Sequence, residues 1–167
     1  SSLEKISLPS SINKIEGYLF KGCSSLSKIF IPSSVTSIGQ CSFKRCQKLN
    51  YVIFERPSLL ESIKKCAFSK CSSLEMIDFP PSINSIDTKS FENCFSLTNI
   101  IIPASNIYLG EDAFTGCPNI LMSYHSVNNY SILNKITNHL MIYGENAMID
   151  QQFKTFIYNI KSITLSN

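Results

Sequence analysis

The sequence predicts an α/β repeat solenoid, a stack of similar coils with a parallel β-ladder on one face. Three observations predict this class. Cysteine and phenylalanine recur with a common period, and leucine, proline and isoleucine keep the same period. The apolar residues within each period alternate as in a half-buried strand. The period is 23 residues, with one repeat of 25. We therefore expect five repeats over residues 1–123.

Five residue columns carry the period. Five of the seven cysteines follow a phenylalanine by three positions and precede a leucine or isoleucine by three. The columns are Cys23, Cys46, Cys71, Cys94 and Cys117; Phe20, Phe43, Phe68, Phe91 and Phe114; Leu3, Leu26, Leu49, Leu74, Leu97 and Ile120; Pro9, Pro32, Pro57, Pro80 and Pro103; and Ile15, Ile38, Ile63, Ile86 and Leu109.

Each element of the unit follows from the second repeat, residues 26–48. Ile29 and Ile31 alternate with polar or exposed positions, which predicts a short strand, and Pro32 ends it because proline cannot donate to a ladder. Val35 and Ile38 form a second short apolar pair. One coil cannot cover these residues, but coils stacked about 4.8 Å apart can.

The rest of the unit is a bend and a turn. Gly39 allows a tight bend, and residues 42–46 predict a single helical turn that carries Phe43 and Cys46 on one side. Glu55 and Arg56 are the extra residues of the longer third repeat. The columns on both sides stay in step, so we expect this insertion to bulge from a turn.

Composition excludes two classes of function. The chain has 15 Lys+Arg and 12 Asp+Glu, a net charge of +3 without a basic run, which gives no footprint for nucleic acid. Apolar runs such as residues 29–31 and 100–102 are far shorter than the roughly 20 residues that span a bilayer. We therefore expect neither nucleic-acid binding nor membrane insertion within this segment.

The seven cysteines fall into two groups. We expect the main column to be buried free thiols that act as small apolar side chains. Cys41 and Cys66 share a column with Tyr18, Lys89 and Asp112, which predicts an outward position. A disulfide between them would fit adjacent coils, but we favour two free surface thiols because touching coils gain little from a crosslink. Zinc is disfavoured because inward and outward cysteines would not converge.

The sequence offers little for catalysis. His125 and His139 are the two histidines of the chain, and neither has a neighbouring cysteine or carboxylate pattern. The six glycines are dispersed, so no phosphate-binding loop is indicated. We expect no catalytic residue, no metal and no cofactor.

The motif resembles a known family. Leu-x-x-Ile-x-Ile-Pro-x-x-Val-x-x-Ile-Gly-x-x-x-Phe-x-x-Cys-x-x-Leu is similar to the BspA-like leucine-rich repeat of many bacterial and protozoan surface proteins. The family's glycine is kept at Gly39 and Gly110, and its alanine at Ala67 and Ala113. The resemblance implies a coil stack that binds partners through its strand face. It also implies adhesion to host or microbial surfaces and no enzymatic activity.

Residues 124–167 depart from the period. Residues 126–130 resemble the segment with which arrays of this type often end, a last strand that turns into a helix. Helical spacing then recurs in Ile132, Leu133, Ile136 and Leu140, and again in Phe153, Phe156, Ile157 and Ile160. We expect an irregular helical cap or a degenerate repeat over the end of the stack, with a separate interaction element as the alternative. The chain begins within a pattern, which indicates a processed chain or a fragment.

The candidate partner-binding residues are the strand residues that remain once the residues expected to be buried are set aside. The strand positions that alternate with the buried ones should face solvent, and five are large and apolar: Phe30, Tyr51, Ile53, Met76 and Ile101. The alternative is that strands favour such residues wherever they lie.

Two functions follow. We expect a cell-surface or secreted adhesion or recognition protein, which an acceptor pattern at Asn129 would suit. The alternative is a cytoplasmic scaffold that assembles protein partners through the same face. Seven cysteines compatible with a reducing compartment and the missing leader would agree with this alternative. An enzymatic role survives only if residues 124–167 belong to a larger domain.

Overall fold

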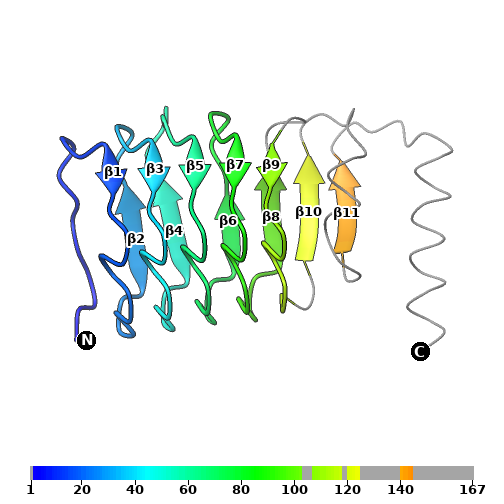
Figure 1. Cartoon of the computed structure of the whole chain (residues 1–167), viewed down its shortest axis with the longest axis horizontal. Helices are drawn as coiled ribbons and strands as arrows, with labels where there is room; N and C mark the ends of the chain where they lie inside the picture. The colour runs from blue at the N-terminus through cyan, green and yellow to red at the C-terminus, as the bar shows by residue number, and fades with distance from the viewer. Residues whose placement is uncertain (1, 103–106, 118–119, 125–139, 145–167) are drawn as a thin grey trace, which may run out of the picture.

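The chain forms a solenoid of parallel strands, as the repeats predict (Figure 1). The computed structural model describes residues 2–102, 107–117, 120–124 and 140–144. Each of the second to fifth repeats makes one coil with a longer strand, a turn, a two-residue strand and a second turn, whereas the first repeat has the two-residue strand alone. Figure 1 shows the coils side by side along the long axis of the molecule. Two sheets result, and every strand pairing within them is parallel.

The longer strands form the first sheet. Its members, in chain order, are β2 (Lys28–Ile31), β4 (Tyr51–Phe54), β6 (Met76–Asp78), β8 (Asn99–Ile102), β10 (Ile120–Tyr124) and β11 (Leu140–Gly144). The register follows the repeat, so that Ile29 pairs with Val52 and Ile31 pairs with Phe54. In β2 and β4 exposed and buried residues alternate, because one face of the sheet covers the core.

The two-residue strands form the second sheet. They are β1 (Lys14–Ile15), β3 (Ser37–Ile38), β5 (Ser62–Ile63), β7 (Ser85–Ile86) and β9 (Tyr108–Leu109). The column isoleucines lie opposite one another, with Ile38 paired to Ile15 and to Ile63. Each of these strands places its second residue in the core.

The core between the sheets is built from the repeat columns. Phe43, Phe68 and Phe91 are completely buried, and successive rings stack with centroids 5.0 to 5.2 Å apart. The main cysteine column is buried beside them. The expected inward direction of both columns is confirmed.

The expected helical turn is wrong, because the described residues contain no helix. The segment from Cys41 to Cys46 is instead a run of turns. Alternate N–H groups of this segment point toward the next coil. Those of Cys41, Phe43 and Arg45 donate to its backbone carbonyls at 2.8 to 3.0 Å. Cys41 and Arg45 adopt positive φ angles of 55° and 65°. These intercoil bonds replace the local bonds of a helix, while Phe43 and Cys46 still point inward.

The surface exposure expected for Cys41 and Cys66 is also wrong. Both residues are buried, with 7% of their surface exposed, and neither forms a disulfide. The column does reach solvent where the side chain is long, since Tyr18 is 52% exposed. The cysteine side chain is short and ends at Sγ, so it stays close to the backbone and does not extend into solvent. Burial raises the pKa of Cys66, and Lys44 partly opposes that rise.

The two ends of the stack differ from expectation. Residues 3–8 form no strand, although Leu3, Ile6 and Leu8 pack against the core. Leu140 was expected in a helix, but it begins β11, which pairs with β10 and extends the first sheet beyond residue 123. The other residues expected to form a strand and helices after residue 125 lie outside the described part.

Candidate interaction surface

The outer face of the first sheet carries most of the candidate residues. Phe30, Tyr51, Ile53 and Met76 are 39 to 54% exposed, and we call these four residues the apolar patch. Phe30 pairs with Ile53, and Tyr51 pairs with both Lys28 and Met76, so three neighbouring strands bring the four together. The alternation of the strands produces this exposure, because the residues between them point into the core.

The fifth candidate lies farther along the same sheet. Ile101 is in β8, where its backbone pairs with that of Asp78 in β6 and that of Ser123 in β10. Its side chain lies outside the described part of the structure. Its neighbour two residues earlier in β8, Asn99, is exposed and polar.

Charged side chains border the apolar patch. Lys28 Nζ lies 5.5 Å from the ring centroid of Phe30, a cation–π contact at the β2 edge. On the β6 side, Arg56 Nη2 donates to Asp78 Oδ2 at 2.9 Å. The patch therefore has an apolar centre and a charged border, which is the usual anatomy of a protein-binding surface.

The inserted residues explain part of this border. Glu55 Oε2 accepts a hydrogen bond from the N–H of Ser33 at 2.9 Å, and this bond lowers the pKa of Glu55. Arg56 reaches the other way, to Asp78. The insertion does leave from a turn, as expected, and it ties its coil to both neighbours. The sequence located the insertion but gave no signal that Arg56 would reach the strand face.

The described residues show neither a metal cluster nor a membrane helix. In that part of the chain no group of three or more His, Cys, Asp or Glu side chains could hold a metal ion. No helix among the described residues is long and apolar enough to cross a bilayer.

The coils and their parallel sheets define a leucine-rich repeat solenoid. Residues 1–121 match the family described as a BspA-type leucine-rich repeat region of six copies. The chain therefore belongs to the BspA-type leucine-rich repeat family, whose members are typically protein-interaction modules. No curated protein matches the chain significantly.

Solved bacterial structures share the fold. A leucine-rich repeat protein of T. pallidum is 29% identical with a TM-score of 0.67, and the match covers 92% of this chain and 81% of that one. A leucine-rich cell surface protein of Faecalibacterium prausnitzii is 29% identical with a TM-score of 0.66, covering 78% of this chain and 34% of that one. A leucine-rich repeat protein of Bacteroides ovatus is 26% identical with a TM-score of 0.51, covering 87% and 46%.

Proposed function

We propose that this chain is a non-enzymatic recognition module that binds a protein partner through the outer face of the first sheet. The apolar patch is the observation that carries the proposal. Four large apolar side chains on three adjacent strands are exposed together, although the chain has a buried core for its other apolar residues. Contiguous exposed apolar groups with a charged border are typical of interaction sites.

The partner should present an apolar centre flanked by charge. Phe30, Tyr51, Ile53 and Met76 would supply contact area, and aromatic residues at such centres often contribute most of the binding energy. Lys28 and the Arg56–Asp78 pair would fix orientation at the border. Ile101 would extend the contact along β8.

We place the module at the cell surface or in a secreted protein, where it would mediate adhesion or recognition. The support is the family and the cell surface protein of Faecalibacterium prausnitzii, which shares the fold at 29% identity. This chain spans about a third of that protein, so the proposal concerns the repeat array alone.

The double substitution Tyr51→Ser and Ile53→Ser tests the apolar patch. The immobilised chain would be used to capture proteins from surface extracts and, separately, from cytoplasmic extracts of the source cells. A partner that uses the patch should bind the variant at least about tenfold more weakly, since a single hot-spot residue at the centre of an interface contributes about 2 kcal/mol or more. Capture from the surface extract alone would support the proposed location.

Leu59→Ser is the matched control. Leu59 is 58% exposed and apolar, but it lies between β4 and β5, away from the apolar patch. Serine suits this column, because Ser34 and Ser82 occupy it in neighbouring coils and donate to carbonyls of the preceding coil. If the double variant keeps both its melting temperature and its partner, the strand-face proposal fails.

A further inference from the structure

The turns between the second sheet and the cysteine column form another face with divided charge. We call the turn segments 39–45, 64–70, 87–93 and 110–116 of the second to fifth coils the turn face. The equivalent turn of the first coil, residues 16–22, carries Glu16 and Lys21 and lies beside segment 39–45, beyond the four segments considered. The first two segments of the turn face carry five cations and no anion, and the last two carry four carboxylates and one lysine. The cations are Lys44, Arg45, Lys64, Lys65 and Lys70, and the other charges are Asp87, Lys89, Glu92, Glu111 and Asp112.

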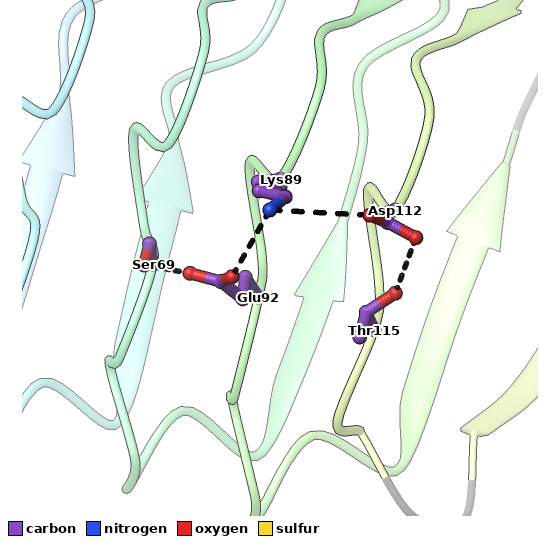
Figure 2. Close-up of polar contacts among 5 residues, drawn as sticks. All are labelled: Ser69, Lys89, Glu92, Asp112 and Thr115. Carbon is purple, nitrogen blue, oxygen red and sulfur yellow. Dashed lines mark hydrogen bonds and ion pairs between the residues drawn. The ribbon is translucent and has the colours of Figure 1, made fainter.

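The two halves differ in how their charges are paired. Among the described residues, none of the five cations of the basic half forms an ion pair. In the acidic half Lys89 Nζ lies 3.8 Å from Glu92 and 4.0 Å from Asp112 (Figure 2). Ser69 donates to Glu92 at 3.0 Å, and Thr115 donates to Asp112 at 3.0 Å. These bonds hold two carboxylates in place without neutralising the half, because four carboxylates share one lysine.

This division selects the kind of partner. A long polyanion lying along the stack would be attracted over two coils and repelled over the next two. A partner that fits the whole face must instead be acidic opposite the basic half and basic opposite the acidic half. A second copy of this chain, turned around, has that pattern, and a two-fold axis makes such a contact self-complementary.

The register of the coils shows which segments would meet. Backbone bonds from Cys41 to Lys65, from Cys66 to Thr88 and from Lys89 to Glu111 keep equivalent positions of the four segments side by side. Consider a two-fold axis that lies in the plane of contact, runs parallel to the turns and passes between segments 64–70 and 87–93. The second copy then presents its coils in the reverse order, so that segment 39–45 faces segment 110–116 and segment 64–70 faces segment 87–93. Each contact occurs twice, and each places the basic half of one copy opposite the acidic half of the other.

We propose that two copies of this chain associate through their turn faces in antiparallel orientation. The turn face and the first sheet pack on the same core, through Phe43 and Ile29 respectively, so they look outward in different directions. The pair would therefore leave both apolar patches free and present them as two binding sites. Self-association does not depend on the partner proposed for the strand face.

The association should be weak and salt-dependent, since exposed ion pairs contribute little individually. Sedimentation velocity over a concentration series measures it directly. At an ionic strength of about 0.01 M, where charges act over about 30 Å, we expect dimers at high protein concentration. At about 1 M, where the range is about 3 Å, the dissociation constant should rise at least about tenfold.

Charge reversal distinguishes this geometry from general attraction. The variant K44E/K65E/K70E and the variant D87K/E92K/E111K should each be monomeric alone, because each then places like charges opposite one another. Mixed in equal amounts, they should form a heterodimer. The control K5E/K14E/K48E has the same change in net charge as the first variant at exposed positions outside the turn face, and it should dimerise like the unchanged chain.

Two results would overturn the proposal. The first is a chain that stays monomeric at low salt and high concentration while a sulfated polyanion binds it through the basic half. The second is a dimer that neither reversal affects. Circular dichroism of each variant shows that a lost dimer does not reflect lost folding.

Discussion

The backbone carbonyls of four column phenylalanines, Phe20, Phe43, Phe68 and Phe91, each accept two hydrogen bonds. The carbonyl of Phe20 accepts one from the N–H of Cys23 at 3.0 Å and one from the thiol of Cys46 at 3.1 Å. Cys71, Cys94 and Cys117 repeat this thiol bond to the phenylalanine of the preceding coil. The cysteines are buried as expected, but they also link coils through a donor that an apolar side chain lacks.

Burial of these thiols makes stability depend on pH. Burial, followed by the neighbouring Cys23, raises the pKa of Cys46 from 9.0 to about 12, and burial also raises the pKa values of Cys71 and Cys94. The folded chain therefore keeps the proton that the unfolded chain loses above pH 9.0. The stabilisation is fully present below pH 9.0 and is lost as pH rises toward 12.

We expect the free energy of unfolding to fall above pH 9, by up to about 1.4 kcal/mol per pH unit for each such thiol. Urea unfolding at a series of pH values measures this slope. Cys46→Ala should be less stable at pH 7 and should show a shallower slope between pH 9 and 12. Lysine and tyrosine ionisation is common to both chains, so the difference reports the thiol. Equal slopes would contradict this assignment.

Adjacent coils are joined by stacked phenylalanine rings. Phe68 is completely buried and stacks on Phe43 at 5.0 Å and on Phe91 at 5.2 Å. Phe20 is 4% exposed, and its one stacking contact among the described residues is with Phe43, at 5.1 Å. A ring inside the stack thus holds two neighbours, whereas Phe20 holds one.

Phe68→Ala should therefore destabilise the chain by about 3 to 5 kcal/mol, the usual range for a buried phenylalanine that leaves a cavity. Phe20→Ala should cost less, because its cavity opens near the end of the stack. Denaturant midpoints of the two variants, measured together with their m-values, test this order. Equal losses would contradict the stacked arrangement.

The whole molecule is an array in which each coil contacts mainly its neighbours. Both sheets follow the order of the coils, and the same columns meet at every junction of the five-stranded second sheet. Stability in such an array is approximately a sum over coils and junctions. The length of the array should therefore be adjustable in whole periods.

Removal of residues 72–94, one period of 23, joins Cys71 to Phe95 and keeps every column in step. We expect this shorter chain to fold with an unchanged β-type circular dichroism spectrum and a lower melting temperature. Removal of residues 72–91, which is 20 residues, should prevent folding because it moves later apolar columns out of the core. If both deletions fold equally well, the array is not built from interchangeable coils.

Much of the fold could be predicted because the period leaves few alternatives. Phe43, Cys46 and Ile38 each recur in neighbouring repeats, and a row of such residues is buried only when coils stack in register. The exposure of Phe30, Tyr51, Ile53 and Met76 followed from strand alternation alone. The turns were predicted less well, because local spacing gave no sign that their N–H groups would bond to the next coil.

The sequence by itself determined the coil length, the inward columns and the exposed positions of the strands, since burial of repeated apolar residues permits one arrangement. Only the tertiary structure decided the burial of Cys41 and Cys66, the thiol bond of Cys46 to Phe20 and the pairing of Arg56 with Asp78. Each of these depends on which atoms of a neighbouring coil come within reach. Separation along the chain does not specify that distance.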